Sequence, residues 1–224
     1  KKLQDYMKLH NPINPATPLP YTSKWIAEVD KHIAKFDGLE IDNVMQAKKV
    51  LYDALFDFNL TSAKLGKHMV QGYFISGGCV ASLLQGEQPK DFDVWFLSKS
   101  VADPIINLYT NDDSYKNDVK DIDEKYRDVI PNKDGKCITE NAITLKNKLQ
   151  LITKHYGTAE EIRSTFDYVH CMPFYEPWSD RLYISHTQYD CCVNKILRIH
   201  NTANLTTWRE NKFKERGYKY GNVE

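Results

Sequence analysis

The stretch over residues 72–98 (GYFISGGCVASLLQGEQPKDFDVWFLS) constrains what this chain can fold into more than any other. Its short apolar run at 73–75 predicts a buried strand. The strand ends at Gly77 and Gly78, where a backbone without a Cβ can take a positive φ or come close to a ligand. Residues 79–84 then predict a short helix, because this apolar run holds neither glycine nor proline.

The second strand of this stretch begins with two acidic side chains. Residues 91–96 read DFDVWF, and the strand period of two places Asp91 and Asp93 on one face. Neighbouring carboxylates repel each other, and strands rarely contain aspartate, so a divalent cation between them explains the pair. Oxygen ligands favour Mg²⁺ or Mn²⁺ with a substrate phosphate completing the coordination, and N–H groups at the glycine pair suit that phosphate. Together these features predict a site for a metal-bound nucleoside triphosphate.

This arrangement resembles the polymerase β-type nucleotidyltransferase superfamily. The signature of that superfamily is an apolar strand, a Gly-Gly or Gly-Ser pair, a short spacer, and an Asp-x-Asp that leads a second strand. Gly77, Gly78, Asp91 and Asp93 fit this signature. Cys79 departs from it, since members often carry a serine there whose hydroxyl helps hold a phosphate, and a thiol is a weak donor. Phosphate binding is therefore expected to depend more on backbone N–H groups.

The resemblance also implies a third acid, supplied by a neighbouring strand. Residues 165–172 (TFDYVHCM) predict a strand, and Asp167 within it is the candidate. In this role Asp167 completes the ligand set of the first metal and acts as base on the attacking hydroxyl. An aspartate at a strand edge, bonded to the backbone, is the alternative. His170 would point to the opposite face, which predicts a packing role.

Basic side chains near the C-terminus complete the predicted nucleotide site. In related enzymes a basic residue on the helix after the third-acid strand often reaches the triphosphate, which makes Lys195 in the predicted helix 186–198 the candidate. Arg209 lies in a second amphipathic piece over 208–217 (WRENKFKERG), where basic and aromatic side chains alternate. Such a surface suits phosphate contact and base stacking, although a solvated helix face explains the pattern equally well.

The order of these pieces further resembles small stand-alone nucleotidyltransferase-like proteins encoded by bacteriophages. Those proteins carry a Phe-Asp strand, then a helix, and then a basic tail with Arg-Gly-Tyr. The corresponding residues here are Phe166-Asp167 and Arg216-Gly217-Tyr218. This wider resemblance covers most of residues 70–220 and is less specific than the aspartate motifs.

Composition limits the partners and the compartment. The 224 residues include 30 lysines and arginines and 30 aspartates and glutamates, so the chain lacks the net positive charge of proteins that bind long duplexes. A small substrate or a local basic groove is expected instead. The five cysteines include no CxxC pair, which indicates reduced thiols rather than disulfides or zinc and predicts a cytoplasmic protein, in the host if phage-encoded. No apolar run is long enough to span a bilayer, so no membrane partner is expected.

The rest of the chain predicts a helical frame around this stretch. The expected organisation is an extended proline-rich arm (1–21), a nucleotidyltransferase-like core with N-terminal helices (22–185), and a basic helical tail packed on the core (186–224). Further elements are expected as helices over 24–36, 42–56, 61–70, 102–109 and 159–164, a charged, partly helical insertion over 111–136, and a hairpin of 137–145 with 149–153. Thr158 and Glu161 form the pattern of a capping box.

The sequence therefore predicts an α/β (α+β) fold in which helices flank a small mixed sheet. The predicted function is metal-dependent transfer of a nucleoside monophosphate from an NTP to a hydroxyl of an RNA end, a protein or a small molecule. Asp91 and Asp93 would hold two Mg²⁺ or Mn²⁺ ions, while Gly77, Gly78 and Cys79 orient the phosphates.

Three alternatives remain open at this point. The first is a catalytically silent member of the superfamily that serves as a binding or structural protein, for example of a phage. The second is a toxin-type enzyme that nucleotidylates RNA or protein. The third is a metal-dependent glycosyltransferase, although in those enzymes an apolar strand tends to lead into Asp-x-Asp, whereas here residues 87–90 (EQPK) precede it and the apolar strand follows.

Overall fold

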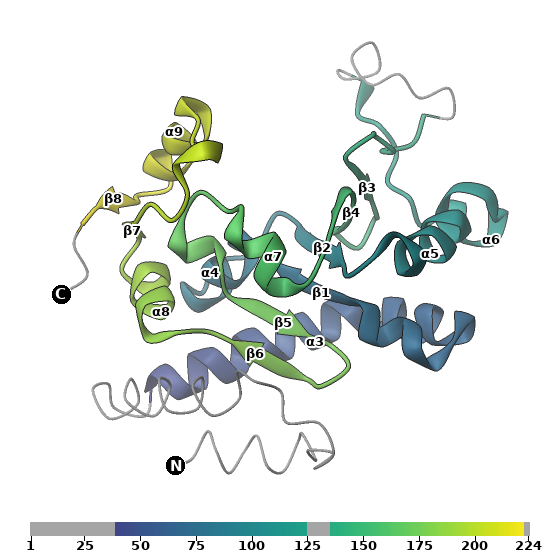
Figure 1. Cartoon of the computed structure of the whole chain (residues 1–224), viewed down its shortest axis with the longest axis horizontal. Coiled ribbons are helices and arrows are strands. Elements are labelled where there is room, and N and C mark those ends of the chain that lie inside the picture. Colours follow the sequence, from purple (N-terminus) through teal and green to yellow (C-terminus); the bar gives the residue numbers. More distant parts are fainter. Residues whose placement is uncertain (1–38, 125–134, 222–224) are drawn as a thin grey trace.

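A mixed β-sheet forms the centre of the molecule (Figure 1). The computed structural model describes residues 39–124 and 135–221, so the predicted arm over 1–21 and the predicted helix over 24–36 lie outside it. Within these residues six strands pair in the order β3-β4-β2-β1-β5-β6. Their bounds are β1 Tyr73–Ser76, β2 Phe92–Phe96, β3 Ala142–Thr144, β4 Leu149–Tyr156, β5 Phe174–Glu176 and β6 Arg181–Tyr183.

Helices flank this sheet, which confirms the expected α/β (α+β) class. They are α3 Leu39–Leu65, α4 Gly78–Leu84, α5 Lys99–Asn111, α6 Asp113–Lys116, α7 Ala159–Ser164, α8 His186–Val193 and α9 Thr207–Glu215. Short 3-10 turns are η1 Lys67–Gly72, η3 Val169–Cys171 and η4 Thr202–Asn204, and β7 Ile196–Leu197 pairs in parallel with β8 Lys219–Tyr220. Among the described residues, no helix is both long and apolar enough to cross a membrane.

Several elements lie where the sequence predicts them. β1, α4 and β2 reproduce the strand, helix and strand of the central stretch. The predicted hairpin is β3 paired antiparallel with β4. The helix α7 begins with the predicted capping box, in which Thr158 and Glu161 each satisfy a backbone N–H of the other. Local sequence patterns suffice for these elements because each is bounded by its own turn or cap.

The first long helix, α3, differs from the prediction. The expected helices over 42–56 and 61–70 are one continuous helix up to Leu65, followed by a 3-10 turn. Phe58 and Ser62 are buried, so the side of the helix that faces the protein interior continues across the break expected between residues 56 and 61. The chain turns only at Gly66, whose φ is +150°.

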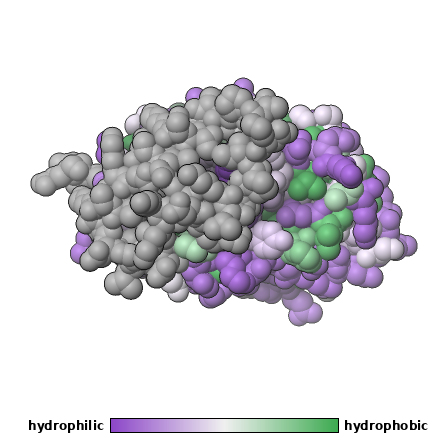
Figure 2. Space-filling model, turned by 90° about the horizontal axis from the view of Figure 1, so that it is seen from below, coloured by the Kyte–Doolittle hydropathy of each residue, from purple (hydrophilic) through white to green (hydrophobic). Residues whose placement is uncertain are grey.

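The outer side of α3 keeps large hydrophobic side chains in solvent. Tyr52, Phe56 and Leu60, spaced four residues apart, are all exposed. In the view from below, hydrophobic side chains gather among hydrophilic ones beside the grey region (Figure 2).

The pairing of β1 with β2 decides which face of the sheet carries the acidic side chains. Tyr73 lies opposite Phe96, and the ring of Phe58 from α3 packs edge-on against Tyr73 at 4.9 Å between centroids. This face therefore lies under α3. Side chains alternate along a strand, so Asp93 and Trp95 occupy the other face, with Phe74 opposite Trp95.

The C-terminal part builds a second, smaller core. Buried side chains in or next to η3, β7, α9 and β8 form it: Tyr168, Cys171, Leu197, Phe213 and Tyr218. His170 is fully buried among the same aromatic rings, in agreement with the expected packing role. The predicted boundary between core and tail at residue 185 stays a prediction.

Two predictions in this part are wrong. Residues 165–172 form a bend and the turn η3 rather than a strand, because the turn ends the pairing after one bridge of Tyr168 with Ile199. In that bridge Val169 N–H donates to Arg198 O, and His200 N–H donates to Asp167 O. The helix predicted over 186–198 ends at Val193, and Lys195 adopts a φ of +52° that a helix does not allow.

Gly72 offers a test of this packing. A Cβ on Gly72 would lie 2.4 Å from Cγ1 and 2.7 Å from Cγ2 of Val101, so we expect Gly72→Ala to lower the free energy of unfolding by about 1–3 kcal/mol. Urea denaturation measures this change. Adding Val101→Ala should restore part of the loss, and Gly221→Ala, where the nearest atom is 3.6 Å away, should be close to neutral. An unchanged unfolding midpoint for Gly72→Ala would contradict the packing.

Candidate functional site

A glycine bend lies directly against an acidic side chain of the neighbouring strand. Gly77, between β1 and α4, has a φ of +120° and donates its N–H to Cys171 O at 3.1 Å. A Cβ on Gly77 would lie 3.0 Å from Oδ2 of Asp93. At Gly78 a Cβ would meet no atom within 4 Å in the described part of the chain. The two halves of the sequence motif are thus adjacent in space, with open room over the second glycine.

The two aspartates of the Asp-x-Asp motif differ in their environments. Asp91 precedes the strand and is exposed, whereas Asp93 is half-buried. Burial, and then the negative charge of Asp91, raise the pKa of the Asp93 carboxyl to about 7, while Lys212 and Arg209 oppose this shift. A cation that approaches this carboxyl stabilises its ionised form, because the positive charge offsets both the cost of burial and the repulsion from Asp91.

Cys79 sits on the first turn of α4 with its thiol inside the protein. Burial raises the pKa of this thiol well above its usual value, and the charges of Asp93 and Asp91 raise it further. The group is therefore a neutral thiol at physiological pH. Any contribution of Cys79 to phosphate binding comes from its backbone, as the sequence predicts.

Asp167 does not join Asp91 and Asp93 in a metal site, contrary to the expectation. Arg209 holds its carboxylate with two hydrogen bonds, Nη2 to Oδ1 at 3.0 Å and Nε to Oδ2. The N–H of Tyr168 also donates to Oδ1 at 3.0 Å. No group of three or more His, Cys, Asp or Glu side chains is placed to hold a metal ion within residues 39–124 and 135–221.

The physical reason lies in the sheet order. The strands beside β2 are β1 and β4, and Asp167 belongs to neither. The residue of β4 that pairs with Asp93 is Gln150, and the sequence of β4, LQLITKHY, contains no carboxylate. A bidentate arginine pair satisfies the buried Asp167 instead.

Helix α9 brings two cations to the acidic strand. Arg209 and Lys212 both lie close enough to Asp93 for their positive charges to act on its carboxyl. Arg209 was expected at the nucleotide site, and it lies between Asp167, which it binds, and Asp93. Lys212 was not among the predicted site residues. Its spacing of three from Arg209, which places both on one helix face, is the signal that identifies it.

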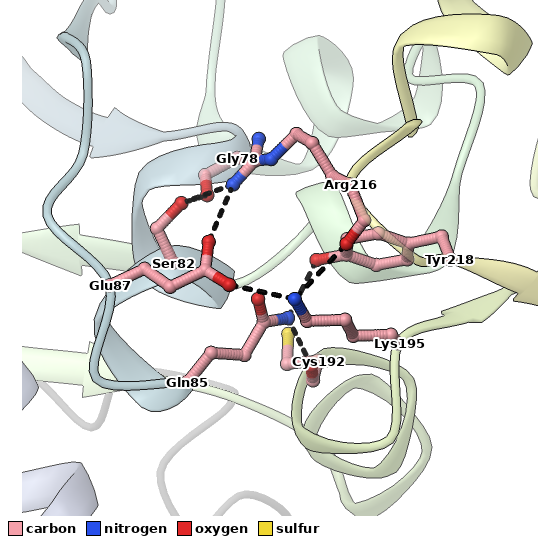
Figure 3. A network of polar contacts seen from close by, with 8 residues as sticks. All are labelled: Gly78, Ser82, Gln85, Glu87, Cys192, Lys195, Arg216 and Tyr218. Atoms are coloured by element: carbon pink, nitrogen blue, oxygen red, sulfur yellow. Dashed lines mark hydrogen bonds and ion pairs between the residues drawn. The ribbon is translucent and has the colours of Figure 1, made fainter. Parts of the chain in front are cut away.

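Lys195 lies elsewhere, contrary to its predicted role at the triphosphate. Its Nζ donates to Oε1 of Glu87 at 2.7 Å and to Arg216 O at 3.0 Å. Arg216 in turn donates to Oγ of Ser82 at 2.8 Å (Figure 3). Gln85 extends the network by donating to the Tyr218 hydroxyl at 2.8 Å. These contacts tie the C-terminal segment to α4, and the Ser82 hydroxyl, which donates to Gly78 O at 3.2 Å, connects them to the glycine bend.

The donor set fits one divalent ion better than two. Asp91 and Asp93 supply carboxylate oxygens, and Mg²⁺ is commonly bound by one or two carboxylates with water and substrate phosphates. The like charge of Asp91 that raises the pKa of Asp93 is the repulsion that such an ion removes. A second ion would need a further side-chain ligand, and Asp167 is already bonded to Arg209.

A comparison with protein-family models identifies the family. The model of the Gabija anti-defense 2 (Gad2) family matches residues 45–191, which is more than half of the 224 residues. The chain belongs to the Gad2 family. The match includes the glycine bend, both aspartates of the Asp-x-Asp motif and Asp167, but it ends before α9.

Solved structures similar to this Gad2 family member are nucleotide-adding enzymes. The Thermotoga maritima CCA-adding enzyme with tRNA is 15% identical, with 75% of this chain and 40% of that chain covered and a TM-score of 0.48. A CCA-adding enzyme with CTP is 16% identical, covered over 87% and 42%, with a TM-score of 0.49. A tRNA nucleotidyltransferase with primer tRNA and an ATP analogue is 14% identical, covered over 62% and 39%, with a TM-score of 0.41.

This chain spans about two-fifths of the length of those enzymes. At these identities and TM-scores the similarity carries no argument about activity. A search of curated proteins found no match. The functional argument therefore depends on the site itself.

The raised pKa of Asp93 gives a pH-dependent stability. Between pH 4 and 7 the folded protein keeps a proton on Asp93 that the unfolded chain releases, so this residue's contribution to stability falls as pH rises through that range. Relative to wild type, Asp93→Asn should gain up to about 1.4 kcal/mol per pH unit from pH 5 to 7, and then level off. Thermal melts without divalent ions measure this. Parallel pH profiles of the two proteins would contradict it, and Asp103→Asn on exposed α5 serves as the control.

Proposed function

We propose that this Gad2 family chain is a metal-dependent nucleotidyltransferase that moves a nucleoside monophosphate from an NTP to a hydroxyl acceptor and releases pyrophosphate. The approach of Gly77 to Oδ2 of Asp93 is the observation that carries this proposal. It places an open backbone beside a carboxylate pair that gains from a cation. Arg209 and Lys212 add positive charge on the same side of the sheet.

Each group has a distinct part in the proposed reaction. Asp91 and Asp93 would hold one Mg²⁺ or Mn²⁺ ion, which would supply charge neutralisation at the phosphates and a lower pKa of the acceptor hydroxyl. Lys212 and Arg209 bind phosphate oxygens through charge-assisted hydrogen bonds. Gly78, where no side chain intervenes, lets the triphosphate approach the backbone.

The reaction forms one bond and breaks one. The acceptor oxygen attacks the α-phosphorus, the bond from that phosphorus to the bridging oxygen of the β-phosphate breaks, and pyrophosphate leaves with the electron pair. The acceptor proton passes to water. Asp167 has no part as metal ligand or base in this proposal, because Arg209 holds both of its oxygens.

Nucleotide binding without transfer is a second candidate function. The observation that favours it is the same pair of Asp167 with Arg209, together with an amide, Gln150, opposite Asp93 on β4. A site with two carboxylates holds a metal-bound NTP but gives less support to a second ion at the acceptor. Such a protein would bind and withhold a nucleotide rather than consume it.

The family name adds a biological setting to either function. It describes proteins that act against Gabija defence. We infer that this chain is phage-encoded, that it works in the host cytoplasm, and that the nucleotide site is its means of acting against that defence. An RNA end or a protein of the defence system is then the acceptor to test first.

Label transfer distinguishes the two functions. The protein is incubated with each α-labelled NTP, Mg²⁺ or Mn²⁺, and either a mixed RNA pool or the Gabija proteins. We expect metal-dependent transfer of label, reduced at least 100-fold in Asp91→Asn with Asp93→Asn, because two anionic metal ligands are lost. Asp103→Asn, an exposed aspartate paired with Lys99 on α5, is the matched control and should keep activity.

The outcomes of this assay separate the alternatives. Transfer that survives the double change at Asp91 and Asp93 would refute the metal assignment. Metal-dependent NTP binding without any transfer would establish the second function instead. Absence of both in the wild-type protein would remove the nucleotide proposal altogether.

A comparison of two lysines tests which cation serves the phosphates. We expect Lys212→Ala to weaken NTP binding by about 1.5–3 kcal/mol, since it removes a charged hydrogen-bond donor beside Asp93. Lys195→Ala should leave NTP affinity unchanged, because that side chain is bonded to Glu87 and to Arg216 O and is not among the charges that act on Asp93. Isothermal titration with Mg²⁺ present measures both. A larger loss of NTP affinity in Lys195→Ala than in Lys212→Ala would instead support the original prediction that Lys195 binds the triphosphate.

A further inference from the structure

The first turn of α9 carries an aromatic side chain that is largely in solvent. Trp208 is 68% exposed, which is more than any other large hydrophobic residue in the described part of the chain. Leaving an indole in water forgoes the stabilisation that burial gives to a side chain of this size. Nearby Phe213 on the same helix is buried in the C-terminal core, so α9 has an inner face that Trp208 does not join.

A lysine connects this indole to the acidic strand. The Nζ of Lys212 lies 5.3 Å from the centre of the Trp208 ring, within the range of a cation–π contact. The charge of the same lysine acts on the carboxylate of Asp93. Lys212 is thus in contact with the indole and within electrostatic reach of Asp93, whose carboxylate lies beside the glycine bend.

A second exposed pair on the same segment lacks this connection. Tyr220 of β8 is 49% exposed, and Nζ of Lys214 lies 5.5 Å from its ring centre. Lys214 is itself held on α9 by Glu210, with 2.5 Å between its Nζ and Oε1 of that residue. The pair is explained by contacts within the C-terminal segment, which makes Tyr220 a matched control for Trp208.

We propose that Trp208 and Lys212 form a stacking platform for the nucleobase of a nucleotide whose phosphates lie at Asp91 and Asp93. This inference rests on the proposed function and extends it from the phosphates to the base. An exposed indole offers a flat surface to any base, and the adjacent ammonium of Lys212 binds the phosphate that follows the sugar. Stacking reads no hydrogen-bonding edge, so the platform accepts all four bases.

Two sources supply such a base: the incoming NTP and the terminal nucleotide of a single-stranded RNA acceptor. Affinities of wild type and Trp208→Ala are measured for an NTP, for inorganic tripolyphosphate and for a short single-stranded RNA, all with Mg²⁺. Tripolyphosphate carries the phosphates without a base. Trp208→Phe keeps an aromatic face, and Tyr220→Ala removes an exposed ring whose neighbouring lysine, Lys214, is not among the charges that act on Asp93.

We expect Trp208→Ala to weaken binding of the NTP, the RNA or both by about 5- to 150-fold, the usual range for one stacked base. Affinity for tripolyphosphate should stay unchanged, and Trp208→Phe should retain most of the wild-type affinity. Loss for the NTP assigns the platform to the incoming nucleotide, and loss for RNA alone assigns it to the acceptor. Tyr220→Ala should bind all three ligands as the wild type does.

Three results would overturn the inference, and they differ in what else they remove. If Trp208→Ala binds the NTP and the RNA as tightly as wild type does, the platform is refuted while the phosphate site stands. If Trp208→Ala loses tripolyphosphate equally, the indole supports the fold rather than a base. If wild-type protein binds neither nucleotide nor RNA, the proposed function fails and the platform fails with it.

Discussion

The close approach of the Gly77 backbone to the Asp93 carboxylate is the constraint on which the rest of the site depends. A side chain at Gly77 would press on the carboxylate, since its Cβ would lie 3.0 Å from Oδ2, and the φ of +120° is one that residues with a Cβ rarely adopt. The contact joins the end of β1 to the beginning of β2 on the face of the sheet that α3 does not cover. It also leaves Asp93 beside Asp91 with little solvent, which is why the pKa of Asp93 rises to about 7.

The balance of charge around this contact comes from α9. Arg209 binds Asp167 through both oxygens and also acts on Asp93, so one guanidinium stands between two acidic side chains. A guanidinium in that position neutralises charge that a metal ion would otherwise neutralise. The same cation therefore stabilises the metal-free protein and is available to the phosphates of a nucleotide.

Much of this molecule is predictable from its sequence, and the exceptions share a cause. The strand, glycine bend, helix and second strand around Asp91 and Asp93 are local, and so is the capping box of α7. The role of Asp167 is not local, because it depends on which strand lies next to β2, and sheet order places β4 there. The prediction for Lys195 fails for a similar reason, because its partner Glu87 is more than one hundred residues away in the sequence. The alternation of side chains along a strand and the capping of a helix depend on short segments, whereas sheet order and ion pairing depend on the whole chain.

The position of α9 in the chain has a consequence for how the site comes into being. Every strand of the six-stranded sheet precedes it, so both carboxylates of the Asp-x-Asp motif leave the ribosome well before Arg209 and Lys212 do. Until α9 emerges, Asp167 lacks its guanidinium partner and the acidic strand lacks its cations. A translation product that stops before residue 207 would keep all six strands and yet have an incomplete site.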